Sequence, residues 1–143
     1  MQKLFCSCMV ALMLGGCDDG SIVTIYDQSI KTTPIECLRV SIMPPNKQIE
    51  KSIKSLYSFK DVCNYSLNIS YKSSIVCNSP YNAAQKNLSA FPNSYLNMEI
   101  RKGMSLEYSY YIDLQHKPNS QDIQKGWQQI TKDLDVKLDI KGE

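Results

Sequence analysis

Alternation between apolar and polar residues predicts several β-strands in this chain. Residues 38–43 alternate in this way, and residues 63–71 do so over a longer stretch. Side chains of a strand point in turn to the two faces of a sheet, so each run should have one buried and one polar face. The second run places Cys63 on the buried face. A further short strand is predicted at residues 22–26.

A β-hairpin is predicted in the second half of the chain. Apolar positions alternate through residues 96–100 and again through residues 104–114, with Arg101-Lys102-Gly103 between them. Gly103 can adopt the left-handed conformation that a three-residue hairpin loop requires. A final short strand is predicted from the alternating residues Val136, Leu138 and Ile140.

Two helices are predicted, and a Pro-Asn pair introduces each of them. Asn46 and Asn119 can cap the helices, because an asparagine side chain accepts hydrogen bonds from the first free backbone N–H groups. Apolar residues at helical spacing then give each helix one face to bury. These residues are Ile49, Ile53 and Leu56 in the first helix, and Ile123, Trp127, Ile130 and Leu134 in the second.

The order of these elements predicts an α+β fold with two layers. In it, both helices cover one face of an antiparallel sheet, in a layout that could be ferredoxin-like, or split βαβ. We expect a single domain over residues 35–143. The polar segment 78–93, which contains Pro80 and Pro92, should be a long loop, and loops of this length are often functional.

The beginning of the chain has the composition of an export signal. Lys3 supplies a positive charge, and the apolar run from Leu4 to Leu14 is shorter than the roughly 20 residues that a membrane-spanning helix needs. Gly15 and Gly16 follow, immediately before Cys17.

The segment Leu14-Gly15-Gly16-Cys17 resembles the lipobox of bacterial lipoprotein signal peptides. The resemblance implies that residues 1–16 are cleaved, that Cys17 is acylated at its thiol and its new amino group, and that residues 17–34 form a tether. Two or three acyl chains anchor a protein stably to a membrane. Asp18 and Asp19 resemble the signal that retains enterobacterial lipoproteins at the inner membrane. The implied location is therefore the periplasmic face of that membrane, with the outer membrane as the alternative.

Three cysteines remain once the leader is removed and Cys17 is acylated: Cys37, Cys63 and Cys77. An oxidising compartment permits one disulfide among them. Cys63 and Cys77 are nearest in sequence, and a bridge between them would contribute about 3 kcal/mol. Cys37 could replace either partner if its strand lies alongside. The spacing of these cysteines is unlike that of a zinc site, so no metal is expected.

Charge and motifs give little support for catalysis or for nucleic-acid binding. The formal net charge is only +2, which argues against nucleic acid as the main partner. The single histidine, His116, lies in a predicted loop, and the sequence has no nucleophile elbow, metalloprotease motif or phosphate-binding glycine loop. No cofactor is expected. An enzyme would need a site assembled from scattered residues such as Tyr111, Asp113 and His116.

Tyrosine is the one residue type whose distribution suggests a contact surface. Tyr111 falls on the face opposite its neighbours Tyr110 and Ile112, and an amphipathic ring on an open sheet face is suited to protein contacts. Lysines 47, 51, 54 and 60 are candidates for contact with anionic lipid head groups. The sequence thus predicts a non-catalytic, membrane-anchored module that binds a protein partner in the envelope. It would act as an immunity- or exclusion-type inhibitor or as an accessory subunit, and the alternative is an enzyme.

Overall fold

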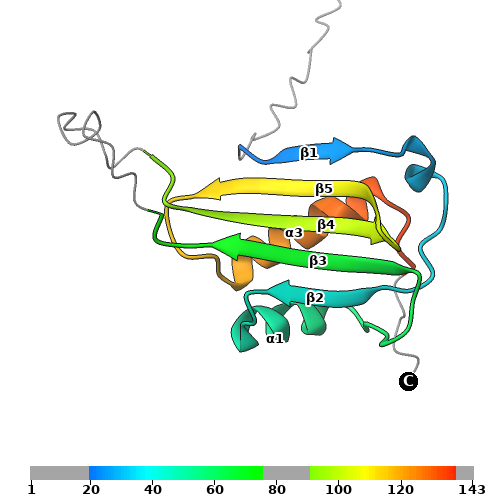
Figure 1. The fold of residues 1–143 in the computed structure, drawn as a ribbon, viewed down its shortest axis with the longest axis horizontal. Coiled ribbons are helices and arrows are strands. Elements are labelled where there is room, and N and C mark those ends of the chain that lie inside the picture. Colours follow the sequence, from blue (N-terminus) through cyan, green and yellow to red (C-terminus); the bar gives the residue numbers. More distant parts are fainter. Residues whose placement is uncertain (1–19, 76–90, 138–143) are drawn as a thin grey trace, which may run out of the picture.

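A computed structural model describes residues 20–75 and 91–137, which form a five-stranded sheet and two α-helices (Figure 1). In chain order the elements are β1 (Ile22–Ile25), the 3-10 helix η1 (Gln28–Lys31), β2 (Arg39–Met43), α1 (Lys47–Leu56), β3 (Tyr65–Lys72), β4 (Ser94–Lys102), β5 (Ser105–Leu114) and α3 (Ser120–Asp133). The α+β fold class predicted from the sequence is confirmed.

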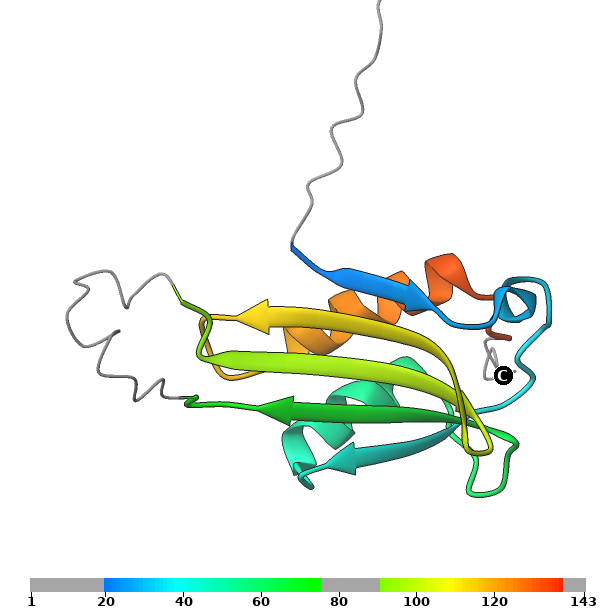
Figure 2. The same ribbon diagram turned by 45° about the horizontal axis from the view of Figure 1, so that its top comes forward.

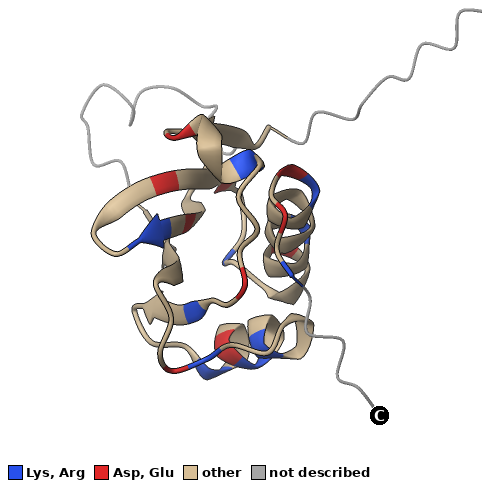
Figure 3. Ribbon diagram, turned by 90° about the vertical axis from the view of Figure 1, so that its right-hand side faces the viewer, with Lys and Arg blue, Asp and Glu red and all other residues tan. Residues whose placement is uncertain are grey.

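The strand order in the sheet is β1-β5-β4-β3-β2. Strands β2 and β3 are parallel and are joined by α1, whereas every other neighbouring pair is antiparallel. Both helices lie on the same side of the sheet, as Figure 3 shows from the end of the strands. The molecule therefore has the two layers that the sequence predicts.

The sheet was predicted to be antiparallel and possibly ferredoxin-like, and this prediction is wrong in the direction of one strand pair and in the strand order. The sheet is mixed, and the described residues contain one βαβ unit rather than two. None of the described residues after α3, 134–137, enters the sheet, and Val136 makes an isolated parallel bridge with Ile35. The reason is that β1 already pairs with β5, so the sheet edge beside β5 is occupied. The other residues of the predicted last strand, Leu138 and Ile140, lie outside the described residues.

The folded domain also begins earlier than residue 35. Strand β1 pairs with β5 from Ile22 opposite Tyr111 to Ile25 opposite Tyr108. Ile30 of η1 is buried, and Val23 and Ile25 pack against the core. Much of the predicted tether, residues 17–34, is therefore part of the domain.

The core fills the space between the sheet and the two helices. Alternate residues of the three central strands point into it, and the largest of them are Leu67, Ile69, Leu96, Met98, Ile100, Tyr108 and Tyr110. Trp127 of α3 is buried, as its place in the apolar stripe predicts. Its ring lies 5.3 Å from Tyr57 and 6.2 Å from Phe59, two residues that follow α1. The indole therefore joins the two helical segments as well as filling the core.

The local signals at the helix starts and at the hairpin are mostly confirmed. Asn46 and Asn119 are the N-caps of α1 and α3, and each side chain accepts hydrogen bonds from two backbone N–H groups. Gly103 has a φ of 59°, in the left-handed region. The turn is shorter than predicted, because Arg101 and Lys102 still belong to β4. Met104 consequently lies in the turn and is 94% exposed, not on the core face.

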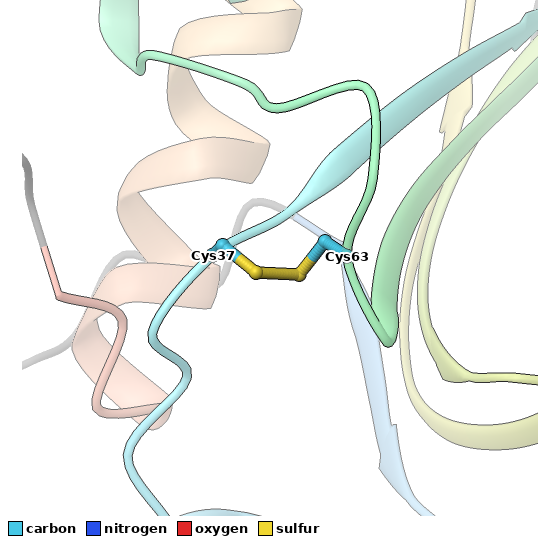
Figure 4. Close-up of a disulfide and its surroundings, with 2 residues drawn as sticks. All are labelled: Cys37 and Cys63. Carbon is cyan, nitrogen blue, oxygen red and sulfur yellow. A yellow bond between two sulfur atoms is a disulfide. The ribbon is translucent and has the colours of Figure 1, made fainter.

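The disulfide joins Cys37 to Cys63, so the preferred pair Cys63–Cys77 is wrong (Figure 4). Cys37 lies just before β2 and Cys63 just before β3. Because these strands are parallel neighbours, their starts lie side by side, and the two Cα atoms are 6.0 Å apart. Nearness in space thus overrides nearness in sequence. Cys77 lies outside the described residues.

Candidate functional site

The sheet face turned away from α1 and α3, here called the open face, is covered by none of the described elements (Figures 1 and 2). Strand alternation and register place mainly polar residues on it. They include Arg39 and Ser41 of β2, Ser66 and Asn68 of β3, Tyr95, Asn97, Glu99 and Arg101 of β4, and Ser109, Tyr111 and Asp113 of β5. Two exposed apolar residues, Ile22 of β1 and Met43 of β2, lie on the same face at its two edges. This face is the candidate functional site.

Two tyrosines form the aromatic part of the open face. The rings of Tyr95 and Tyr111 stack with their centroids 5.7 Å apart and their planes at 24°. Tyr111 Oη donates a hydrogen bond of 2.8 Å to Asp113 Oδ1. This bond, together with partial burial, raises the pKa of Tyr111 to about 12. The stack and the hydrogen bond together restrict the orientation of the Tyr111 ring.

The polar part of the open face is a short network along β4. Asn97 Nδ2 donates to Glu99 Oε1 over 3.0 Å, and Arg101 Nε donates to Glu99 Oε2 over 3.0 Å. Residues two positions apart on a strand share a face, so three alternate side chains hold one another in place. The Glu99 carboxylate thereby has a guanidinium and an amide as partners, and its charge is balanced locally.

A cleft of about 750 Å³ continues the open face around the outer edge of β2. Residues of the open face, among them Arg39, Asn68 and Arg101, line one side, and Glu50 and Lys54 of α1 line the other. The backbone N–H of Lys60 donates to the carbonyl of Leu38 at the start of this edge. The volume is in the range of ligand pockets, and the lining mixes charges of both signs with apolar atoms.

Of the residues predicted for a catalytic alternative, Tyr111 and Asp113 are hydrogen-bonded to each other, whereas His116 pairs with Asp122. His116 Nε2 lies 2.9 Å from Asp122 Oδ2, while Asp113 bonds to Tyr111. Asp122 is buried, and it also accepts a bond from the N–H of Asn119 as part of the capping box of α3. The His116–Asp122 contact therefore reinforces the start of a helix.

A further carboxylate, that of Asp133, has a structural role at the edge of the core. It accepts hydrogen bonds from Tyr108 Oη over 2.8 Å and from Gln129 Nε2 over 2.9 Å. Burial, and secondly the bond to Asp133, raises the pKa of Tyr108 well above its usual value. Among the residues in view, no group of three or more His, Cys, Asp or Glu side chains is placed to hold a metal ion.

Three of the four lysines proposed for lipid contact, Lys47, Lys51 and Lys54, recur at helical spacing along one side of α1, and Lys60 follows the helix. Lys47 begins α1, at the end of the sheet where β2 ends. Lys51 lines a hollow between the helices that also includes Ser52 and Ser120, whose hydroxyls are 2.7 Å apart. Lys54 pairs with Glu50, and Lys54 and Lys60 both line the cleft at β2.

Sequence reasoning placed Tyr111 on the polar face of the sheet but did not consider Tyr95. The signal was present, because alternation puts Tyr95 on the same face as Asn97 and Glu99. Pairing of β4 with β5 then brings Tyr95 opposite Asp113 and diagonally next to Tyr111. The strand pairing, which the sequence does not give at residue level, was the missing step.

Comparison with protein-family models, with curated proteins and with solved structures finds no significant match to this chain. No helix in the described ranges combines the length and apolarity needed to cross a membrane. The predicted anchor residue Cys17 and the sorting residues Asp18 and Asp19 lie outside those ranges.

Proposed function

We propose that the chain is a lipoprotein anchored at the periplasmic face of the inner membrane, where its open face binds a protein partner. It acts without catalysis, as an immunity- or exclusion-type inhibitor or as an accessory subunit of an envelope complex. The observation that supports this most directly is the stacked pair Tyr95 and Tyr111 on a sheet face that no described element covers.

Tyrosine is suited to this role for two physical reasons. Its ring supplies a large contact area with few rotatable bonds, and its hydroxyl supplies a hydrogen bond. In Tyr111 the ring already stacks on Tyr95 and the hydroxyl already bonds to Asp113, so little side-chain entropy remains to be lost on binding. The adjoining cleft at β2 would extend the contact with polar and charged groups.

Binding is tested with a tagged full-length chain expressed in its own host. A stoichiometric protein partner should be recovered from membranes, and Tyr95→Ala with Tyr111→Ala should remove it. Lys125→Ala is the matched control, since it changes an exposed side chain on α3. The proposed binding role would be contradicted if the double tyrosine variant captured as much partner as the Lys125→Ala control. Recovery of no stoichiometric partner by the unchanged chain would also contradict it.

The anchor is tested separately with Cys17→Ser. This change removes the thiol at the lipobox, so incorporation of labelled palmitate and recovery in the membrane fraction should both be lost. Continued labelling of the variant would show that another residue is acylated.

Retention at the inner membrane is tested by replacing the two aspartates that follow the anchor. In an enterobacterial host, Asp18→Ser combined with Asp19→Ser should move the protein to the outer-membrane fraction. Recovery of the unchanged protein from outer membranes of its own host would refute the inner-membrane location.

A further inference from the structure

Strand β2 is the last strand at one side of the sheet, and its outer side is here called the β2 edge (Figure 1). The backbone groups of a strand point in turn to its two sides, so an edge strand directs half of them away from the sheet. Leu38, just before β2, shows which half this is, because its carbonyl accepts a hydrogen bond from the N–H of Lys60, which lies outside the sheet. Two residues further on and four residues further on, Val40 and Ile42 therefore direct their N–H and C=O groups outward as well.

The far end of β2 gives the same assignment. The ladder with β3 runs to Met43, and Pro44 after it has no N–H to donate. Parallel strands bond through alternate residues, so the last bonds to β3 come from Met43 itself, and Val40 and Ile42 face the other way. No other part of the described chain bonds to these outward groups. They are therefore available to an incoming strand.

The cleft at β2 gives this edge room on both of its faces. Its lining includes Ser41 from the open face and Val40, Ile42 and Phe59 from the helix side. The last three are apolar side chains that are only partly buried, at the margin of the core. A strand laid along β2 would place alternate side chains against them and extend the core by one further row.

On the open-face side, the charge nearest the β2 edge is Arg39 of β2 itself, whose side chain is exposed and has no ion-pair partner among the described residues. The other charges of the cleft are offset: Lys54 pairs with Glu50, Arg101 pairs with Glu99, and Lys60 adjoins Asp61 in the chain. Arg39 therefore favours a carboxylate on the side of an incoming strand that faces it.

We infer that the β2 edge binds an extended segment of the protein partner, which adds a strand beside β2. The segment has apolar residues at the alternate positions against Val40, Ile42 and Phe59, and an acidic residue beside Arg39. Backbone hydrogen bonds supply the affinity of such a strand, and its alternate side chains supply the specificity. The inference rests on the proposed protein-binding role and names the part of the partner that this edge takes.

The test uses the full-length protein, isotope-labelled and kept in detergent micelles, and a synthetic peptide with blocked ends. The peptide has the sequence Thr-Val-Glu-Val-Glu-Val-Thr, which alternates as the inference requires. Its binding is followed by NMR, with hydrogen exchange of the backbone amides as the readout of place. Exchange at Val40 and Ile42 should slow when the peptide is added, whereas exchange at Val23 and Ile25, on the opposite edge of the sheet, should not change.

Val40→Pro removes one outward N–H and keeps the ladder with β3, so it should weaken peptide binding by about tenfold. Val23→Pro is the matched control on β1, where Val23 is also only partly buried. The N–H of Tyr26 bonds to Glu107 beside β5, so alternation turns the N–H of Val23 to the outside of the sheet. This control should bind the peptide as the unchanged chain does, and circular dichroism checks that both variants fold.

A second arm leaves the backbone unchanged and tests the charge. The unchanged chain should bind the peptide with glutamates several-fold more tightly than Thr-Val-Lys-Val-Lys-Val-Thr. Arg39→Glu should reverse this preference, because it exchanges attraction for repulsion beside the same edge.

The outcomes separate this inference from the proposed function. Slowed exchange on β1, equal binding by Val40→Pro and Val23→Pro, or a preference that Arg39→Glu leaves unchanged would overturn docking at the β2 edge, and partner capture through Tyr95 and Tyr111 would stand. A dimer of the purified chain that Val40→Pro dissociates would assign the edge to a second copy, and would also overturn it. Recovery of no partner from membranes overturns the binding role, and the inference falls with it.

Discussion

The two faces of the sheet are built on different principles. Side chains on the inner face interlock with partners from distant parts of the chain, as Trp127 does with Tyr57 and Phe59. Bonds on the open face are short-range, between residues two positions apart on one strand, such as Glu99 with Arg101 and Tyr111 with Asp113. The inner face thus holds the fold together, while the open face arranges its own side chains and contributes little to overall stability.

The largest expected loss of stability comes from Trp127→Ala on the inner face. Removing a buried indole that contacts two other aromatic rings should lower the free energy of unfolding by about 3–5 kcal/mol. Urea denaturation followed by circular dichroism measures the loss. Tyr111→Ala on the open face is the comparison, and its loss of one stacked ring and one hydrogen bond should cost less, on the order of 1 kcal/mol. Equal losses in the two variants would break the contrast between the faces.

The disulfide between Cys37 and Cys63 should also stabilise the fold. Its contribution to the free energy of unfolding is measured with Cys37→Ser combined with Cys63→Ser. The bridge spans a sequence separation of 26, and a loop of that size corresponds to about 3 kcal/mol in the chain-entropy model. The double variant should therefore unfold at lower urea concentration. Reduced wild-type protein is the control, and it should unfold at the same urea concentration as the double variant. If reduction has no effect on the unfolding midpoint, the cross-link does not contribute.

Close packing of the inner face predicts an unfavourable outcome for Gly126→Ala. A Cβ atom at this position would overlap Met98 Sδ and lie 3.0 Å from Tyr110 Cε1, and both of these residues are buried. Overpacking of this kind costs about 1–3 kcal/mol, which exceeds the gain of about 1 kcal/mol from the helix propensity of alanine. Gln128→Ala, on the exposed side of α3, should be close to neutral. A stabilised Gly126→Ala protein would mean that α3 lies further from the sheet.

The smallest effect concerns ionisation on the open face. Because the bond to Asp113 raises the pKa of Tyr111 to about 12, Asp113→Asn should let Tyr111 lose its proton at lower pH, nearer 10. A raised pKa favours the folded state below the usual tyrosine value, and this contribution is lost as the pH rises towards 12. Alkaline difference absorbance measures the shift, and Tyr111→Phe identifies the titrating ring. An unchanged titration in Asp113→Asn would show that the bond does not form in solution.

Sequence alone was sufficient for the elements whose signals are local. The caps Asn46 and Asn119 and the left-handed Gly103 mark helix starts and a turn through their own chemistry, and all three are confirmed. Pairing between distant segments was not predictable in the same way. The pairing of β1 with β5 brings the first strand to an edge of the sheet, and the neighbouring starts of β2 and β3 decide the disulfide.

The candidate site shows the same division. Tyr111 could be assigned to the polar face by counting along one strand, whereas its partner Tyr95 required knowledge of the register between β4 and β5. The cleft at β2 depends on residues from β2, β3, β4 and α1 together. No pattern within a single segment could have revealed it.

The position of β1 at the edge of the sheet also sets an order of events during folding. Residues Ile22–Ile25 pair with Tyr108–Tyr111, so the first strand has no sheet partner until most of the described chain has been synthesised. Long-range pairing of this kind forms late, because the intervening chain must be available before the loop can close. Under the proposed anchoring, this delay is the period in which Cys17 would be acylated, before Ile22–Ile25 join the sheet.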